Sequence, residues 1–151
     1  MKNKNLIPQT ICQNRKARHD YHILDTVECG IVLLGSEIKS VRDHKLSFDG
    51  SYATVENNEL WLIDANIEPY KNASNFQHSP KRKRKLLLKR HEIHKIAEKA
   101  EMTGNTLVPL SAYFKNGFAK IELAVCQGKK LHDKRQAEKE KDAEKEIRRY
   151  K

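Results

Sequence analysis

The most distinctive chemistry in this sequence belongs to a run of cations. Residues 81–90 read KRKRKLLLKR, with no acidic residue among them. Such a run repels itself and needs anions nearby. Nucleic-acid phosphates are the favoured partners, because neutralising them releases counterions; a nuclear-localisation signal and a solvated charge run are the alternatives. The leucines that follow indicate that the run is anchored to a core. The candidate phosphate contacts are Lys81, Arg82, Arg84 and Lys85.

Two further clusters carry basic side chains. The first stands before the first predicted strand and contains Asn14, Arg15, Lys16, Arg18 and His19. It is interpreted as a segment that follows RNA phosphates, although a solvated strand entry is an equal alternative. The second contains Gly128, Lys129, Lys130, His132, Lys134 and Arg135. Arginine and histidine can stack on bases as well as meet phosphates, so this cluster is also a candidate RNA contact.

The sequence contains few patterns that indicate catalysis. His91 and His94 enclose Glu92 at a spacing one residue short of the HExxH zinc motif. The three cysteines, Cys12, Cys29 and Cys126, are far apart and odd in number, which favours reduced thiols over a disulfide framework or a zinc site. The sequence therefore predicts no metal, no cofactor and no enzymatic activity. A ribonuclease that uses His19 and Asp20 is kept as a rival hypothesis.

Composition agrees with a polyanionic partner. The chain has 151 residues, with 30 Lys+Arg against 20 Asp+Glu, a formal net charge of +10. A surplus of this kind on a small chain favours nucleic acid. No apolar run approaches the ~20 residues of a membrane span, and no lipidation signal or signal peptide is evident. We therefore expect a monomeric, cytoplasmic protein with no membrane partner.

Short strands and a few helices must position these side chains. Strands are predicted around residues 21–34, 52–55, 60–69, 107–114 and 121–125, with hairpin turns at 56–59 and at Asn116-Gly117. A short helix capped by Ser36 and a second helix over 91–102 are also predicted. Residues 70–80 are expected to form a loop, and Pro109 an edge or bulge. The pattern predicts a mainly β fold with a few helices, a small antiparallel OB-like β-barrel.

The ends of the chain are expected to lie outside this barrel. Residues 1–13 are predicted to be a flexible arm, and residues 14–127 the RNA-binding barrel. Composition changes at Gly128, because residues 128–151 contain few large apolar side chains but many Ala, Glu, Lys and Arg. This flexible basic tail cannot bury enough surface to order itself, yet its residues are strong helix formers. We expect it to be disordered alone and helical on a partner.

Several segments together carry a resemblance to a known family. The stretch NRKARHDYHILDTVECGIVLLGSEIKSVR resembles the opening of SsrA-binding (SmpB) proteins, in the residues Asn14, Ala17, His19, Asp20, Tyr21, Glu28, Gly30, Gly35, Glu37, Ile38, Lys39, Ser40, Val41 and Arg42. Later matches are Ser51-Tyr52, residues 67–70, Pro80 with Arg82, residues 84–88, Gly128-Lys129-Lys130 and residues 132–135. The departures, Cys29 where alanine is usual and Lys83 where threonine is usual, are small.

This resemblance implies a function. It implies binding to the transfer-RNA-like part of transfer-messenger RNA (SsrA RNA), delivery of that RNA to stalled ribosomes for rescue and tagging, and elongation factor Tu as a companion. The implied RNA contacts are Asn14, Glu28 and the stretch Lys85-Leu86-Leu87. The tail is implied to enter the empty messenger channel of the small subunit through Gly128, Lys129, Lys130, His132, Asp133, Lys134 and Arg135. The alternative is a general single-stranded RNA-binding OB-fold protein.

A carboxylate among the implied contacts has a definite chemistry. Glu28 cannot meet a phosphate favourably. If it touches RNA, it must accept a hydrogen bond from a base N–H or from a ribose 2′-hydroxyl. Without the family resemblance, an ordinary strand carboxylate is the favoured interpretation.

Overall fold

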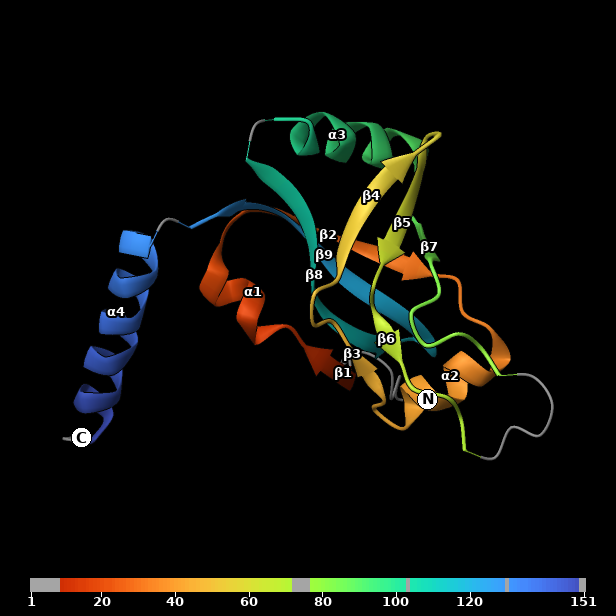
Figure 1. The fold of residues 1–151 in the computed structure, drawn as a ribbon, viewed down its shortest axis with the longest axis horizontal. Helices are drawn as coiled ribbons and strands as arrows, with labels where there is room; N and C mark the ends of the chain where they lie inside the picture. The colour runs from red at the N-terminus through yellow and green to blue at the C-terminus, as the bar shows by residue number, and fades with distance from the viewer. Residues whose placement is uncertain (1–8, 72–76, 103, 130, 150–151) are drawn as a thin grey trace, which may run out of the picture.

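Strands dominate the fold (Figure 1). The computed structural model describes residues 9–71, 77–102, 104–129 and 131–149. One sheet contains seven strands: β1 (Gln9–Gln13), β2 (Tyr21–Ile31), β4 (Tyr52–Glu56), β5 (Glu59–Ile63), β7 (Arg84–Leu87), β8 (Asn105–Lys115) and β9 (Phe118–Gly128). A second, small sheet pairs β3 (Leu46–Ser47) with β6 (Asn66–Ile67). The helices are α1 (Arg15–Asp20), α2 (Gly35–Arg42), α3 (Arg90–Ala100) and α4 (Leu131–Arg149).

The main sheet closes on itself. Its order is β1-β8-β4-β5-β7-β2-β9, and β8 also pairs with β9. All these pairings are antiparallel. The strands from β8 through β4, β5, β7 and β2 to β9 therefore form a ring, with β1 added to β8. This confirms the predicted mainly β fold of OB-like type with a few helices.

Two tight turns set the register of this ring. Asn57 and Asn58 connect β4 to β5 with φ values of 50° and 62°. Asn116 and Gly117 connect β8 to β9 with φ values of 53° and 80°. Two-residue hairpin turns of type I′ need positive φ at both central residues, which asparagine and glycine tolerate best. Both predicted hairpins are confirmed. The predicted bulge is confirmed as well, because the β8–β9 register shifts between Pro109 and Ser111.

The core fills the inside of the ring. Alternate residues of the strands point inward and are almost completely buried, among them Leu60, Leu62, Leu86, Ile121 and Leu123. Val41 of α2 and Ile96 of α3 join this cluster. Figure 1 shows α3 near one end of the ring and α2 near the other.

Helix α1 lies on the outside of the ring and was not predicted. Its N-cap is Asn14, whose side-chain oxygen accepts from the Ala17 N–H at 3.1 Å. Ala17 packs with Val108 and Ala124 of β8 and β9 in a second buried cluster. This contact explains why alternation fails in β9: Ala124 and Cys126 face outward, yet both are fully buried.

Part of the predicted N-terminal arm belongs to the sheet. Its residues 9–13 form β1, which covers the edge of β8 with Gln9 opposite Phe114 and Gln13 opposite Ser111. Strand β8 is longer than its partner β4, and β1 satisfies the backbone groups that β4 leaves unpaired. Ile11 anchors β1 in the core at 6% exposure. Residues 1–8 of the predicted arm lie outside the described residues.

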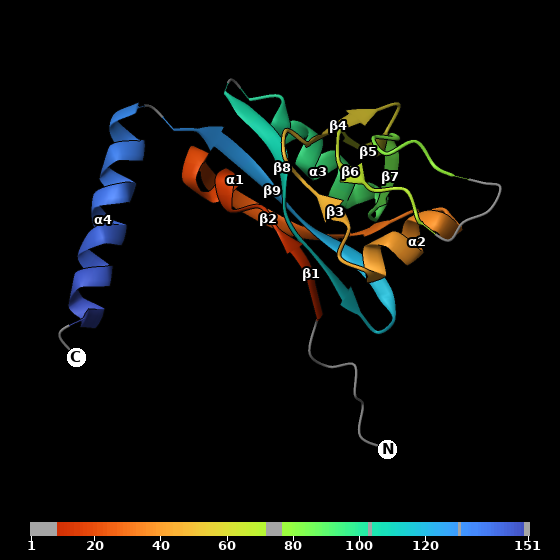
Figure 2. The same ribbon diagram turned by 60° about the horizontal axis from the view of Figure 1, so that its bottom comes forward.

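Two helices were predicted from the sequence, and the structure contains both. Helix α3 is confirmed, within two residues of its predicted end. The predicted cap of α2 is wrong: Leu34 is the N-cap, and Glu37 accepts from its N–H at 2.8 Å. The described part of the tail forms α4, which stands apart from the sheet on the side of α1 (Figure 2). Its helix-forming composition accounts for this helix; that the tail is disordered alone stays a prediction. Of the predicted loop, residues 72–76 lie outside the described residues.

Candidate RNA interface

A patch of uncovered sheet brings together side chains from four strands. Gly30 of β2 lies opposite Leu87 of β7 and Lys120 of β9, and Lys120 lies opposite Tyr113 of β8. In the next row Glu28 lies opposite Glu122, and Glu122 opposite Ser111. Side chains of paired residues share one face of a sheet. We call this patch the outer face; it comprises Glu28, Leu87, Ser111, Tyr113, Lys115, Lys120 and Glu122.

Glu28 is held at the centre of the outer face. The Tyr113 hydroxyl donates to its Oε2, and the Lys115 Nζ lies 3.3 Å from Oε2 and 3.4 Å from Oε1. The hydrogen bond from Tyr113 and the charge of Lys115 lower the pKa of Glu28 below its ordinary value, against a smaller opposing effect of burial. Glu28 is therefore an ionised, half-exposed acceptor, as an RNA contact of the predicted kind requires.

The second carboxylate of the outer face, Glu122, is directly opposite Glu28. Like charges in such cross-strand positions are unfavourable unless other groups compensate them. The Ser111 hydroxyl donates to Glu122 at 3.2 Å, and the Arg18 guanidinium lies 4.0 Å from it. Because Arg18 belongs to α1, it joins the basic side of that helix to the outer face.

The cations of β7 divide between surface and interior. Lys85 and Leu87 face outward, and Lys85 pairs with Glu59 at 3.2 Å. Arg84 and Leu86 face inward, at 0% and 1% exposure. Strand alternation places both side chains in the core; that Arg84 and Leu86 contact RNA stays a prediction.

Arg84 has a buried acidic partner. Its Nε lies 2.5 Å from Oε2 of Glu37, which is itself 0% exposed. Arg82, also a predicted RNA contact, binds the other oxygen of Glu37 at 2.6 Å and remains about a third exposed, at 31%. The Arg84 guanidinium further donates to the backbone oxygens of Ala65 and Pro80. Lys81 is exposed.

Helix α1 carries the second predicted cluster. Arg15, Lys16 and Arg18 are exposed and available to phosphates. Asn14 is not: it is 9% exposed, and its Nδ2 donates to the Pro109 oxygen at 2.9 Å. Asn14 therefore caps α1 in this structure, and its predicted RNA contact stays a prediction. His19 is half-buried and hydrogen-bonds to Asp20 and to Glu138 of α4, each at 3.0 Å.

The third predicted cluster lies where the ring meets α4. Gly128 ends β9, and the Lys129 N–H donates to the Asp20 oxygen at 2.9 Å. Lys134 lies 3.4 Å from the Asp20 carboxylate, and Arg135 is exposed. Lys130 and the side chains of His132 and Asp133 lie outside the described residues.

Sequence reasoning missed most of the outer face. In the sequence, Lys120 and Glu122 alternate with the apolar Ile121 and Leu123, which predicts that the two charged residues face outward. Nothing in the sequence, however, showed that Tyr113 and Lys115 would meet Glu28, because that contact depends on which strands are neighbours.

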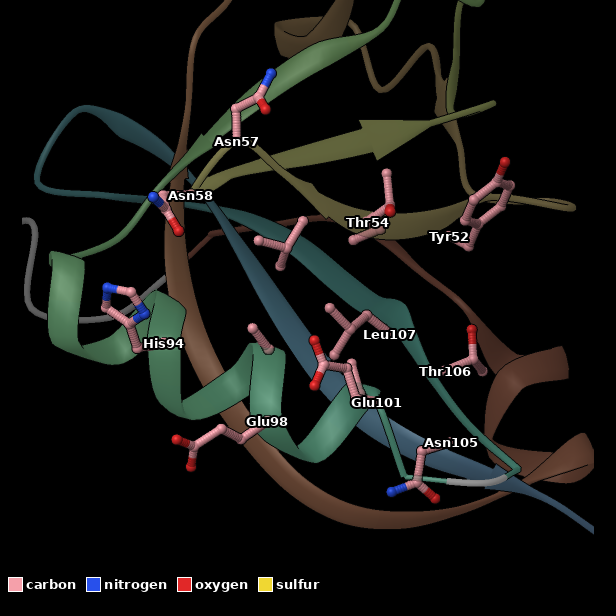
Figure 3. Close-up of a pocket in the computed structure, with 14 residues that line it drawn as sticks. Tyr52, Thr54, Asn57, Asn58, His94, Glu98, Glu101, Asn105, Thr106 and Leu107 are labelled. Carbon is pink, nitrogen blue, oxygen red and sulfur yellow. The ribbon is translucent and has the colours of Figure 1, made fainter.

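A polar pocket of about 680 Å³ lies elsewhere, between α3 and the strands β4 and β8 (Figure 3). It is lined by Tyr52, Asn58, His94 and the carboxylates Glu98 and Glu101, among others, and no lysine or arginine among the described residues lines it. Carboxylates without cations repel phosphate. This pocket therefore does not suit an RNA backbone.

The cysteines and acidic residues show no reactive arrangement in the described part of the chain. Burial raises the pKa of Cys12 and Cys126 to about 11 and that of Cys29 to about 12. These thiols are therefore protonated at neutral pH. Within residues 9–71, 77–102, 104–129 and 131–149, no group of three or more His, Cys, Asp or Glu side chains could hold a metal ion. None of the helices in those ranges is long and apolar enough to cross a membrane.

Comparison with known proteins gives concordant matches. The model of the SmpB protein family matches residues 11–151. SsrA-binding proteins of Desulfitobacterium hafniense, Halothermothrix orenii and Corynebacterium diphtheriae are 49%, 52% and 53% identical. The alignments cover 94%, 93% and 97% of this chain and 91%, 91% and 89% of the relatives. One chain of a solved structure is 49% identical to this chain, with a TM-score of 0.68. The structure is described as "tmRNA-SmpB: a journey to the center of the bacterial ribosome". The match covers 80% of this chain and 85% of the chain in that structure.

Proposed function

The chain belongs to the SmpB protein family, and from that premise we propose that it is the RNA-binding adaptor of ribosome rescue. It binds transfer-messenger RNA (SsrA RNA) and brings it to stalled ribosomes, where incomplete proteins are tagged. The observation that carries this proposal is the family match over residues 11–151. The related solved structure, which its description places with tmRNA and the ribosome, supports both partners.

The geometry suggests how a folded RNA is held. The exposed cations of α1 and Lys120 of the outer face meet backbone phosphates, and this part of the binding weakens as salt rises. Glu28 accepts from a donor on a base or a ribose, which fixes the register of the RNA. Folded RNA is read largely by its shape and its 2′-hydroxyls, and a rigid sheet with separate cations and acceptors suits that mode.

The tail has a separate task in this proposal. Helix α4 and the basic residues before it enter the messenger channel of the small subunit when that channel is empty. The cations Lys129, Lys130, Lys134 and Arg135 then pair with ribosomal RNA phosphates. Elongation factor Tu accompanies the complex, the protein acts as a monomer in the cytoplasm, and it carries out no reaction itself.

Competition binding tests the RNA claim. Labelled transfer-RNA-like domain of transfer-messenger RNA is bound to the full chain and displaced with the unlabelled domain or with a polyU strand. We expect the unlabelled domain to compete and polyU to compete much less. Equal competition would instead favour a general single-strand binder.

A cleavage assay tests the non-enzymatic claim. The RNA is incubated with pure protein and divalent metal ions, and we expect it to stay intact. Cleavage that is lost in the His19→Ala or Asp20→Ala variant would show a ribonuclease instead.

A further inference from the structure

Tyr113 makes an unusual contact for a strand residue. It lies on β8, while its hydroxyl donates to Glu28 on β2, and β9 runs between these two strands. Neighbouring strands are about 4.8 Å apart, so the two backbones are separated by roughly twice that spacing. A tyrosine is long enough to bridge it.

We propose that Tyr113 is a positioning residue for RNA recognition: its hydroxyl fixes one oxygen of the Glu28 carboxylate and thereby presents the other, Oε1, to a hydrogen-bond donor of the RNA. This inference rests on the proposed RNA-binding function. The donor is an N–H or O–H group of a base or a ribose, because a carboxylate only accepts.

An unrestrained glutamate would be a poor reader of RNA. Glu28 is half-exposed on a strand, and a free glutamate side chain loses much rotamer freedom when it is immobilised on a partner. Tyr113 has only two χ angles and is itself half-buried, so it makes a stiff support. With the carboxylate already fixed in the free protein, RNA binding avoids part of that entropy loss.

Lys115 cannot replace Tyr113 in this role. Its ammonium lies about equally far from both oxygens of Glu28, 3.3 Å and 3.4 Å, and so does not favour one of them. An ammonium on a flexible stem acts as a point charge, and it is free to move to a phosphate when RNA binds. The phenol remains a donor, because burial and the Glu28 carboxylate raise the pKa of Tyr113 well above its ordinary value.

The first measurement asks whether the hydrogen bond exists in solution. Carbon-detected NMR of the Glu28 carboxylate is recorded against pH in the wild type, in Tyr113→Phe and in Tyr52→Phe. Tyr52 is a matched control, since it is an exposed strand tyrosine whose ring lies outside the outer face. We expect Tyr113→Phe to raise the titration midpoint of Glu28 and Tyr52→Phe to leave it unchanged. An unchanged midpoint in Tyr113→Phe would overturn the proposal.

The second measurement is a double-mutant cycle at neutral pH, where Glu28 is ionised in every variant that contains it. We expect Tyr113→Phe to weaken binding of the transfer-RNA-like domain by about threefold to tenfold, the usual range for one hydrogen bond. In the Glu28→Ala background the same change should have no further effect.

Three results would contradict the proposal in different ways. An equal loss in both backgrounds would mean that Tyr113 contacts the RNA itself. No loss in Tyr113→Phe would mean that Glu28 needs no support. An unaltered affinity of Glu28→Ala would remove the contact that Tyr113 is meant to position, while RNA binding by the chain, and so the proposed function, would stand.

Discussion

Arg84 and Lys85 are consecutive cations of one basic run, yet strand alternation gives them opposite environments. Arg84 is fully buried against Glu37, whereas Lys85 lies on the surface and pairs with Glu59. Removing one partner of a buried ion pair lowers the stability of the fold strongly, because the other charge is then left uncompensated in the protein interior. A surface pair contributes little, since water screens it.

Matched methionine substitutions separate these two roles. We expect Arg84→Met to lower the free energy of unfolding by about 3 kcal/mol, since the buried Glu37 carboxylate then loses one of its two arginine partners. Lys85→Met should change it by about 0.5 kcal/mol or less. Urea denaturation followed by circular dichroism measures both. Equal effects of the two substitutions would show that the buried ion pair stabilises the fold no more than the surface pair does.

Glu37 also predicts a pH dependence of stability. Burial alone would raise its pKa, but hydrogen bonds from Arg82, Arg84 and the Leu34 N–H outweigh burial and hold it below the ordinary value. A depressed pKa stabilises the fold above the unfolded-state value of about 4.3 and ceases to do so as pH falls through the folded-state value.

We therefore expect the urea midpoint of the wild type to fall below about pH 4.5. The Glu37→Gln variant should be less stable at neutral pH and should lose less stability on acidification. Other carboxylates with a lowered pKa, such as Glu28, contribute equally to the acid sensitivity of the wild type and of Glu37→Gln. If the urea midpoints of the wild type and of Glu37→Gln fell in parallel with pH, Glu37 would be excluded as a source of the acid sensitivity.

Local sequence signals were enough to predict some elements but not others. The turn at Asn116-Gly117 and helix α3 were predictable, because turn chemistry and apolar spacing act within a few residues. Strand β1 and helix α1 were missed, because each is stabilised by β8, a strand about a hundred residues away. The Tyr113–Glu28 contact spans 85 residues. Such contacts require knowledge of strand order, which spacing along the chain does not contain.

At the scale of elements, α4 is tethered to α1 by charged groups. The His19 ring hydrogen-bonds to Asp20 through Nδ1 and to Glu138 through Nε2, and Lys134 also lies near Asp20. Two carboxylates can both accept only from a doubly protonated ring. Accordingly the hydrogen bonds to Asp20 and Glu138 raise the pKa of His19.

This tether should loosen as pH rises. A raised pKa means that the contact is fully present below the unfolded-state value of about 6.5 and is lost as pH rises through the folded-state value. Amide NMR shifts along α4 near Glu138 should therefore titrate with His19, and His19→Gln should abolish that titration. Persistence of the titration in His19→Gln would assign it to another group.

At the scale of the whole molecule, the ring and the tail have a definite junction. Gly128 still pairs with Tyr21, and the Lys129 N–H donates to the Asp20 oxygen. A boundary near Cys126 would therefore cut into β9 and remove the pairing of Gln127 and Gly128 with β2. A truncation that removes the tail and leaves the ring intact must therefore be made after Lys129.

A chain that ends at Lys129 should therefore keep the stability of the ring and bind the transfer-RNA-like domain with an affinity close to that of the full chain. It should fail to tag stalled proteins in a translation reaction on messengers without a stop codon, because nothing remains to enter the messenger channel. A chain that ends at Cys126 serves as the control and should be less stable in urea. Loss of RNA binding in the Lys129 truncation would show that α4 contributes to the RNA interface, and normal tagging by it would show that the tail is dispensable.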